Sequence, residues 1–499
     1  MLVKSSGIVI AIFTLLLTAC AHRPVSDNSI HVTLLHINDV YEITSVSNGQ
    51  YGGLARLATL RKQLLNRNPN TLTLIGGDFF SPSAMGTAKI NGERLAGKQM
   101  VSVLNAMGLQ YATFGNHEFD LGKDQFYRRM EESKFNWVSS NVFDEQGNRF
   151  KDVKQNTVIE FTSNDGQHQF KLALFGLTID SNKADYVTYL DLFTATKQQL
   201  NQLEDKSDFI IAFTHLAINE DETLVKKFPA INLVLGGHEH ENYQRWRANQ
   251  TPILKADANA RSAYVVDLYY DPRTGKTRIE PRLVFIDDSF VDDAAVKAVV
   301  NQWVKKVFDA FREQGFDPEE IVANVTEDLD GREASVRNQS TNLTRLISQA
   351  ALQAYKQADV AIYNSGSVRI DDVLPAGKIS VYDIIRTLPF GGGIALVNMK
   401  GDLLIKVLNQ GLANKGSGGY LQSSNTALRK NKWHVKNLLI EPNKQYKVAI
   451  ADFLLTGKET GLSYLTVENP DISLIDEDKR SDIRQLLIKY MKQHDIQHK

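Results

Sequence analysis

Short apolar runs alternate with longer amphipathic stretches over roughly the first 290 residues of the chain. Runs of aliphatic and β-branched residues are typical of buried strands, and their alternation with helical stretches favours an α/β fold. Two later runs, residues 263–270 and 278–286, have no long helical stretch between them, so we expect antiparallel neighbours in a mixed sheet. The earlier predicted strands include residues 31–37, 71–75, 171–175, 209–213 and 231–235.

A helical pattern at residues 292–312 separates this region from a second one. Helical spacing places on one face the apolar residues Val296, Val299, Val300, Trp303, Val307 and Phe311. Turn signals follow at Gln314-Gly315 and Asp317-Pro318. We therefore predict a first domain at residues 30–290, a linker helix within 291–320, a second α/β domain at 321–475 and a charged tail at 476–499 with a helix around 483–491.

The composition excludes several classes of protein and partner. A chain of 499 residues with 42% apolar residues is long enough for two or three globular domains. Its 57 Lys and Arg against 58 Asp and Glu leave a formal charge of -1, so a nucleic acid polymer is not an expected partner. Only one cysteine is present, so neither a disulfide partner nor a thiolate metal site is expected.

The first twenty residues have the order of an export signal. Lys4 precedes an apolar run at residues 7–17, and Leu17-Thr18-Ala19-Cys20 follows as a small-residue cleavage site. This segment resembles the lipobox of bacterial lipoproteins, which implies removal of residues 1–19, lipidation of Cys20 and a tether at 20–29. The resemblance implies a membrane anchor facing the periplasm or cell surface, and Ala21 favours the outer membrane. A cleaved signal peptide with an incidental cysteine is the alternative.

Five apolar runs end in side chains that can bind metal ions. Strand ends of α/β sheets are where ligands collect, because loops there aim polar groups from a rigid support. Oxygen and imidazole donors of this kind suit Mn, Zn, Fe or Mg. The five endings are Asn38-Asp39, Gly76-Gly77-Asp78, Gly115-Asn116-His117, Thr214-His215 and Gly236-Gly237-His238-Glu239-His240. Taken singly, such an aspartate commonly caps a helix and such a histidine lies in a core, but the ordered set indicates a metal site.

This ordered set resembles the calcineurin-like metallophosphoesterases, and specifically the 5'-nucleotidase family. The resemblance implies a four-layer αββα sandwich of mixed sheets, joined by a helix to a smaller C-terminal α/β domain. It implies a site for two divalent metal ions (Mn, Zn, Co, Mg or Fe) bridged by Asp78. Asp39 and His240 would complete the first subsite, and Asn116, His215 and His238 the second.

The same resemblance makes His117 and Asp120 a catalytic pair. Two cations held together clamp phosphoryl oxygens and activate water for in-line attack on phosphorus. A cationic His117, oriented by Asp120, would stabilise the phosphoryl charge and donate a proton to the leaving oxygen.

One residue departs from the family pattern at the first subsite. The pattern continues Asp-x-His, whereas this chain has Asp39-Val40-Tyr41. A phenol with an ordinary pKa near 10 is a poor neutral ligand, although Fe(III) can deprotonate it. Three outcomes follow: a subsite one ligand short and filled by water, an altered metal preference, or lost activity. We favour the first, because the other ligands are present.

The second domain resembles the substrate-binding domain of the same family at three segments. These are Asn364-Ser365-Gly366-Ser367-Val368-Arg369, Leu388-Pro389-Phe390-Gly391-Gly392 and Asp452-Phe453-Leu454. The resemblance implies that Phe390 and Phe453 sandwich a base and that Asn364 and Arg369 make polar contacts. Arg337 matches a further arginine, and Glu459 stands where the family has an aspartate that contacts ribose.

The expected function is phosphomonoester hydrolysis of extracytoplasmic nucleotides, from nucleoside 5'-phosphate and water to nucleoside and phosphate. A UDP-sugar, dinucleotide or 2',3'-cyclic nucleotide hydrolase is an alternative for the same site. A non-catalytic nucleotide-binding surface lipoprotein is a second alternative, to which Tyr41 and Glu459 would point.

Overall fold

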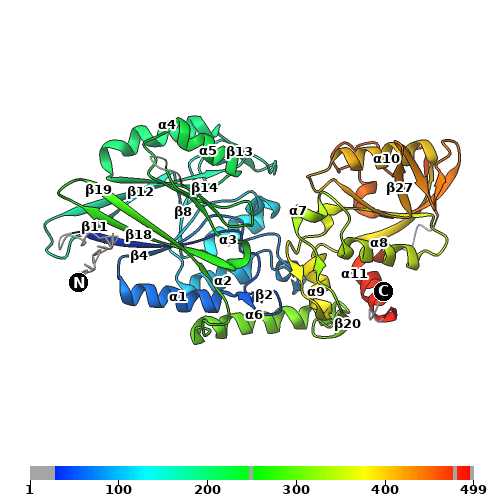
Figure 1. Ribbon diagram of the computed structural model, residues 1–499, viewed down its shortest axis with the longest axis horizontal. Coiled ribbons are helices and arrows are strands. Elements are labelled where there is room, and N and C mark those ends of the chain that lie inside the picture. The colour runs from blue at the N-terminus through cyan, green and yellow to red at the C-terminus, as the bar shows by residue number, and fades with distance from the viewer. Residues whose placement is uncertain (1–28, 247–250, 476–479, 495–499) are drawn as a thin grey trace, which may run out of the picture.

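The computed structural model describes residues 29–246, 251–475 and 480–494. These residues form a larger N-terminal domain with two sheets and a smaller C-terminal α/β domain beside it (Figure 1). The predicted signal segment and Cys20 lie outside the described residues. Within the described ranges, no helix combines the length and apolar character that crossing a membrane requires.

A seven-stranded mixed sheet forms one inner layer of the larger domain. Within it, β1 (Ile30–Ile37) pairs in parallel with β4 (Thr71–Ile75) and antiparallel with β18 (Ser262–Asp271). The two strands predicted as antiparallel neighbours are indeed paired, as β18 and β19 (Lys276–Phe285). The remaining strands, outward from β4, are β7 (Tyr111–Ala112), β8 (Asn136–Val138) and β10 (Val153–Lys154).

A six-stranded mixed sheet packs face to face on the first. Its core is the parallel set that the apolar runs predict, and their side chains meet those of the first sheet, as Phe213 and Leu34 do in one buried cluster. In spatial order its strands are β11 (Asn156–Thr162), β12 (Gln169–Thr178), β14 (Phe209–His215), β15 (Leu233–Gly236), β17 (Ile253–Lys255) and β16 (Tyr243–Arg245).

Helices cover both outer faces, which confirms the four-layer αββα arrangement. The outer face of the first sheet packs on α1 (Leu54–Arg67), α2 (Lys98–Met107) and α6 (Ala294–Glu313), where Leu35 and Ile37 join Val103 and Val300 in one core. On the second sheet, α4 (Leu192–Leu203) and α5 (Ile218–Lys227) bury Leu200 and Leu224. Figure 1 shows α4 and α5 on one side and α1 and α6 on the other.

Helix α6 follows the first domain and runs beneath it toward the second (Figure 1). The Asp293 side chain accepts a hydrogen bond from the Val296 N–H and caps its first turn. Val296, Val300, Val307 and Phe311 are buried, as the helical spacing predicts.

The second domain is built on a six-stranded sheet flanked by helices. The final helix, α11 (Ile483–Gln493), buries Ile483, Leu487 and Met491 and packs against α8 (Asn342–Ala354), so it belongs to this domain's core. The sheet consists of β26 (Leu421–Ser424), β22 (Val360–Asn364), β30 (Gln445–Ala451), β25 (Gly393–Lys400), β31 (Ile472–Leu474) and β32 (Ser481–Asp482), and the other long helix is α10 (Gly401–Ala413).

Shorter elements connect these layers. Two lie at the junction of the domains, α7 (Glu333–Val336) and α9 (Val381–Thr387) (Figure 1). The others are α3 (Lys123–Glu132), β2 (Ser45–Val46), β3 (Tyr51–Gly52), β5 (Lys89–Ile90), β6 (Glu93–Arg94), β9 (Val142–Asp144), β13 (Val187–Tyr189), β20 (Ile321–Val325), β21 (Leu329–Asp330), β23 (Val373–Leu374), β24 (Gly377–Ser380), β27 (Thr426–Arg429), β28 (Lys432–Val435) and β29 (Leu438–Leu439).

A buried ionic network joins the two domains. Glu42, which follows β1, accepts a hydrogen bond from the Tyr382 hydroxyl at 3.1 Å and lies 3.7 Å from Arg386. Asp372 lies 3.2 Å from Arg261 and 3.9 Å from Arg386. These hydrogen bonds and ion pairs would be broken if the two domains separated. The network therefore holds the second domain against the end of the first domain at which β1 and β4 finish.

Candidate metal centre and catalytic pair

The ends of the strands converge where the two sheets meet. β1, β4 and β7 are parallel neighbours in one sheet, and β14 and β15 are parallel neighbours in the other. His215 Nδ1 lies 2.7 Å from the Gly76 carbonyl, and His36 Nε2 lies 2.9 Å from the Gly236 carbonyl, so hydrogen bonds join the two edges. All five predicted clusters of donors are thereby brought to one place.

Three buried side chains form a group that could hold a metal ion. Donor atoms of Asp39, Asp78 and His215 all lie within 4.8 Å of one another. Burial alone lowers the pKa of His215, but the carboxylates of Asp78 and Asp39 outweigh it and raise the pKa to about 9. The buried carboxylates are therefore stabilised by a nearby positive charge. In the metal-free protein the proton on His215 supplies it, and a bound cation would supply it instead.

Orphaned donors mark the second predicted subsite. Among the described residues, neither His215 Nε2 nor Asn116 Oδ1 has a hydrogen-bond partner, although both are buried. His215 Nε2 lies 3.2 Å from Asp78 Oδ2. The His238 ring is 5.3 Å from the His215 ring, and burial, then His215, lower the pKa of His238 to about 3, so its imidazole is neutral. Unpaired amide oxygen and imidazole nitrogen atoms fit a divalent cation.

The hydroxyl of Tyr41 lies among the donors of the first predicted subsite. Its oxygen is 3.4 Å from Asp39 Oδ1, 3.2 Å from Asp78 Oδ2 and 3.0 Å from His240 Nε2. Asp39 Oδ1 and His240 Nε2 are 3.5 Å apart. Ligands about 2.0–2.2 Å from a tetrahedral ion lie about 3.3–3.6 Å from one another. The Tyr41 oxygen is thus spaced from these atoms as one metal ligand is from another, and it is also within hydrogen-bond distance of all three.

Close backbone approaches make this donor geometry possible. Asp39 and Asp78 adopt left-handed φ values of 54° and 57°, which aspartate tolerates better than most side chains. Gly77, at φ 82°, and Gly115 lie where a Cβ atom would collide with the neighbouring turn, and at Gly115 it would meet the Asp78 carboxylate itself.

Glu118 ties these two turns together, a role that the sequence alone does not reveal. Its buried carboxylate accepts hydrogen bonds from the N–H groups of Asp78, Phe79, Phe80 and Gly115 at 2.6–3.1 Å. Burial, followed by the Asp78 charge, raises the pKa of Glu118 to about 7. Glu118 therefore fixes the spacing between the Asp78 turn and the loop that carries Asn116.

The predicted catalytic pair is in contact. His117 and Asp120 begin and end a single 3-10 turn, and His117 Nδ1 lies 2.7 Å from Asp120 Oδ2. Burial alone lowers the pKa of His117, but Asp78 and Asp120 outweigh it and hold the pKa above its ordinary value. Ser81 Oγ donates to Asp120 Oδ2 at 3.1 Å, and Asn182 Nδ2 donates to Asp120 Oδ1 at 2.9 Å.

Asn182 and Ser81 are functional candidates that sequence reasoning missed. Asn182 Nδ2 also donates to the Asn116 carbonyl at 2.9 Å, so it connects the catalytic pair to a predicted ligand. Asn182 follows the end of β12 by a few residues, and this position after a strand is the feature of the sequence by which it could have been identified. No motif surrounds it in the sequence.

Further carboxylates and a lysine support the His238–His240 loop. Asp371, from the second domain, contacts His240 Nδ1 through Oδ2 and leaves Nε2 facing the first subsite. Lys255 is fully buried and its Nζ lies 2.5 Å from Glu239 and 2.8 Å from Asp221. A carboxylate on the outer nitrogen of a histidine orients the ring as a metal ligand.

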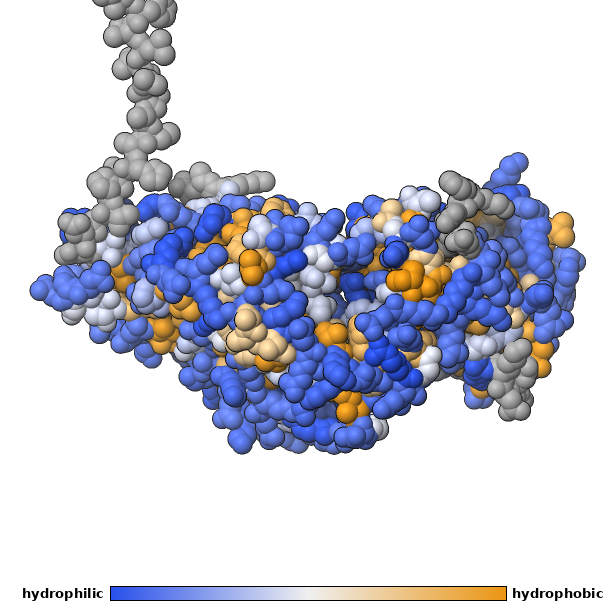
Figure 2. Space-filling view, turned by 90° about the horizontal axis from the view of Figure 1, so that it is seen from below, coloured by the Kyte–Doolittle hydropathy of each residue, from blue (hydrophilic) through white to orange (hydrophobic). Residues whose placement is uncertain are grey.

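The second domain presents two exposed aromatic rings, and one of them lines a cavity with a member of the catalytic pair. Phe390 and Phe453 are 45% and 42% exposed, so both rings are accessible to a ligand. Asp452 Oδ2 accepts the Gly393 N–H at 2.9 Å and so joins the two aromatic segments. A cavity of about 320 Å³ is lined by Phe390 and Arg369 on one side and Asp120 on the other. Figure 2 shows a hollow between the two domains on a largely hydrophilic face.

The remaining predicted contacts lie around the same domain edge. Asn364 is buried and its Oδ1 accepts from Ser367 at 2.8 Å, while Arg337 and Arg369 both approach Glu333. The Glu459 carboxylate accepts the Thr460 N–H at 2.8 Å and lies beside Gly419.

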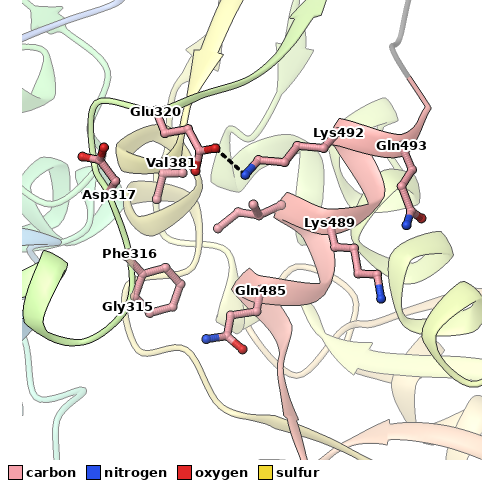
Figure 3. Close-up of a pocket in the computed structure, with 10 residues that line it drawn as sticks. Gly315, Phe316, Asp317, Glu320, Val381, Gln485, Lys489, Lys492 and Gln493 are labelled. Atoms are coloured by element: carbon pink, nitrogen blue, oxygen red, sulfur yellow. Dashed lines mark hydrogen bonds and ion pairs between the residues drawn. The ribbon is translucent and has the colours of Figure 1, made fainter.

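A second cavity, of about 440 Å³, lies between α11 and residues 315–320. Two of its charged side chains form an ion pair with each other, in which Lys492 Nζ lies 2.6 Å from Glu320 Oε1 (Figure 3). None of the predicted metal donors lines this cavity. The candidate functional site is therefore the cavity at the junction of the two domains.

Comparison with known proteins matches both halves of the chain. The family model of the calcineurin-like phosphoesterases matches residues 32–242, and that of the 5'-nucleotidase C-terminal domain matches residues 321–466. The trifunctional nucleotide phosphoesterase YfkN of Bacillus subtilis is 27% identical over 79% of this chain, which spans 28% of YfkN. The 5'-nucleotidase of Vibrio cholerae is 25% identical, over 85% of this chain and 84% of its own length.

Among solved structures, a 5'-nucleotidase precursor from Thermus thermophilus has the same fold. It superposes with a TM-score of 0.74 at 20% sequence identity, covering 93% of this chain and 96% of the other. The likeness extends across both domains.

Proposed function

This chain belongs to the calcineurin-like phosphoesterases that carry a 5'-nucleotidase C-terminal domain, and from that membership we propose that it hydrolyses nucleoside 5'-phosphates to nucleoside and phosphate. It is a phosphoester hydrolase. The observation that carries the proposal is one cavity lined by Asp120 of the catalytic pair and by Phe390 and Arg369 of the second domain. A phosphate held at the metal donors would leave its base within reach of exposed aromatic rings.

Two divalent cations are proposed for the site. Asp78, Asn116, His215 and His238 would hold one, and this assignment is supported by the buried Asn116 Oδ1, which has no hydrogen-bond partner among the described residues, and by the close approach of His215 Nε2 to Asp78. Asp39, Asp78, Tyr41 and His240 would hold the other. When bound, such ions neutralise the phosphoryl oxygens and make water nucleophilic near neutral pH. Mn, Zn, Co, Mg and Fe all suit these donors.

His117 is proposed as the proton donor to the leaving oxygen. Asp78 and Asp120 raise its pKa against the effect of burial and so favour the protonated ring, and the hydrogen bond from Nδ1 to Asp120 directs Nε2 away from that carboxylate. Ser81 and Asn182 hold Asp120 in place. Arg369 and Phe390 would orient the nucleoside so that the departing oxygen faces His117.

The location of the enzyme is proposed to be extracytoplasmic, with a lipid anchor at Cys20 in the outer membrane. The order of Lys4, the apolar run at 7–17 and Leu17-Thr18-Ala19-Cys20 supports this. Mass spectrometry of the mature protein tests it: an N-terminal peptide that retains residues 1–19 would contradict the proposal.

A substrate panel tests the proposed function. We expect metal-dependent release of phosphate from nucleoside 5'-monophosphates, with kcat/KM at least about tenfold above that for p-nitrophenyl phosphate, because base stacking is worth about 1–3 kcal/mol. Phe390→Ala and Phe453→Ala should remove that advantage and leave p-nitrophenyl phosphate turnover unchanged. The panel should include a UDP-sugar, a dinucleotide and a 2',3'-cyclic nucleotide. Preference for one of these, or nucleotide binding without turnover at saturating metal, would overturn the proposal.

The Tyr41 position gives a separate prediction about metal content. Burial, followed by Asp78 and Asp39, raises the pKa of Tyr41 well above its ordinary value, so its neutral phenol is a weak ligand for a divalent ion. Tyr41→His should tighten binding at the first subsite by about tenfold or more, since imidazole is the better donor. Tyr41→Phe should reduce the bound metal toward one ion per chain. Elemental analysis after dialysis measures both, and equal stoichiometry in all three proteins would contradict the assignment.

A further inference from the structure

Two arginines of the second domain share one carboxylate. Arg337 Nη2 hydrogen-bonds to Glu333 Oε1, and Arg369 Nη1 lies 3.8 Å from the same oxygen. Only 26%, 23% and 21% of the side chains of Arg337, Glu333 and Arg369 are exposed, so water screens these charges incompletely. A pair of arginines that would present two positive charges to a ligand therefore presents a net charge of about one.

This cluster lies immediately beyond the first metal subsite. The Glu333 N–H donates to Asp371 Oδ1 at 2.6 Å, and Asp371 Oδ2 contacts His240 Nδ1. One carboxylate and one imidazole ring thus separate Glu333 from the donors around Tyr41. On the other side, Arg369 Cζ is 5.9 Å from the centre of the Phe390 ring. The cluster therefore lies between the phosphoryl centre and the aromatic rings, where the group next to the transferred phosphate would lie.

The cluster retains some capacity for a ligand. Within the part of the chain that the structure describes, the buried Nε of Arg369 has no hydrogen-bond partner. A sugar hydroxyl in this position could accept from Arg369 and donate to Glu333. An additional phosphate in the same position would bring its negative charge close to the Glu333 carboxylate.

We propose that Glu333 is a specificity-determining residue that favours nucleoside monophosphates by weakening the attraction of the arginine pair for a second phosphate. The proposal deepens the proposed nucleotidase function and rests on it. In a monophosphate the ribose occupies this position and its hydroxyls satisfy Glu333. In a diphosphate whose terminal group is at the metal donors, the inner phosphate occupies it, meets the Glu333 carboxylate and is attracted by a net charge of about one instead of two.

Glu333→Gln tests this charge effect, because glutamine keeps the shape and one acceptor oxygen while removing the charge. We expect the ratio of kcat/KM for ADP to kcat/KM for AMP to rise by about tenfold or more, the size expected for removing one incompletely screened like charge. Glu441→Gln is the matched control. The Glu441 side chain is 69% exposed and lies just before the start of β30. Asn364 of the predicted substrate site lies at the end of β22, which is parallel to β30, so Glu441 lies at the opposite end of the sheet from that site. The control should leave the ratio unchanged.

Removing an arginine should act in the opposite direction. Arg337→Gln should lower the ADP to AMP ratio, and the double variant Glu333→Gln, Arg337→Gln should return it toward the wild-type value, because the net charge is then restored. An unchanged ratio in Glu333→Gln, or equal losses for both substrates without a change in ratio, would overturn the proposal.

Inhibition of p-nitrophenyl phosphate hydrolysis separates this inference from the proposed function. Glu333→Gln should lower the inhibition constant of pyrophosphate by about tenfold more than that of phosphate. If the wild-type enzyme hydrolyses p-nitrophenyl phosphate but no nucleotide, the proposed function fails. The pyrophosphate to phosphate ratio then decides the charge inference: a shift supports it, and an unchanged ratio overturns it.

Discussion

Replacing His117 by alanine is expected to lower kcat by about 10²–10⁴-fold, the range over which a positioned general acid contributes. The physical reason is that His117 carries a proton held by Asp120 at 2.7 Å and faces the position where the leaving oxygen would develop charge. KM and metal content should change little, because none of the proposed metal contacts uses the imidazole of His117. Steady-state kinetics and elemental analysis of the same preparation measure the two effects.

The matched control is His434→Ala, on the β27–β28 hairpin far from the metal donors (Figure 1). It should leave kcat unchanged. Activity of His117→Ala within threefold of the wild type would contradict the assignment of the proton donor. So would a loss of bound metal comparable to the loss of activity, since His117 would then act as a ligand.

Asp120→Asn probes the same pair through the pH profile. The pKa of His117 is raised, so the ring is protonated below that value and loses its proton as the pH rises through it. Activity that needs the proton therefore declines on the alkaline side. Removing the Asp120 charge removes one of the two carboxylates that raise this pKa, so the alkaline limb should move to lower pH. A limb that stays in place would contradict the pairing.

Asp78→Asn is expected to lower hydrolysis by about 10³-fold or more, because several kcal/mol of charge stabilisation depend on cations that share this carboxylate. The backbone should tolerate the change, since asparagine also accepts the left-handed φ of 57° at this position. Its side-chain oxygen can still accept the His117 N–H that now donates to Asp78 Oδ1 at 2.8 Å. The effect is therefore one of charge.

Thermal unfolding with and without metal separates this effect from misfolding. A ligand at 100 times its Kd adds about 2.7 kcal/mol to the unfolding free energy, and this gain should be lost in Asp78→Asn. In chelator the variant should be somewhat less stable than the wild type: burial alone raises the pKa of Asp78, but His215 and His117 outweigh it and hold the pKa below its ordinary value, so the Asp78 charge stabilises the metal-free fold. Asp402→Asn, at an exposed position of α10, is the control. Wild-type metal content in Asp78→Asn would contradict the bridging role.

The strands of the first domain are well predicted by their apolar runs. β4 covers the predicted residues 71–75, and β1 and β14 extend their predictions by one or two residues. Both sides of these strands are buried between layers, so apolar residues predominate in them and the strands stand out from the surrounding helices. The sequence pattern predicts helix α6 equally well, because one of its faces is buried and the other is solvated.

The convergence of the five donor clusters also follows from local sequence. Each cluster directly follows a buried strand, and parallel strands end at the same edge of a sheet. That reasoning needs no knowledge of side-chain packing. It cannot identify residues whose neighbours are distant in the chain, such as Asp371, which contacts His240 from the other domain.

Tyr41 shows where local pattern and geometry differ. The sequence marks it only as a departure from a motif, which led us to expect a subsite one ligand short. The structure places its hydroxyl 3.0–3.4 Å from three donor atoms, within hydrogen-bond distance of Asp39, Asp78 and His240. Distances of this kind come from the packing of β1 against the His238–His240 loop, which lies almost 200 residues away in the chain.

The sequence by itself determined the layers of this protein, the order of its metal donors and the family to which it belongs, because these depend on short apolar runs and the residues that directly follow them. Only the tertiary structure decided which charges share a partner. Glu333 between two arginines, Asp371 on His240 and Glu42 beside Arg386 are pairings between segments that are separate in the chain or in different domains. Coulombic and hydrogen-bond energies depend on distances of a few ångströms, and chain position does not encode those distances.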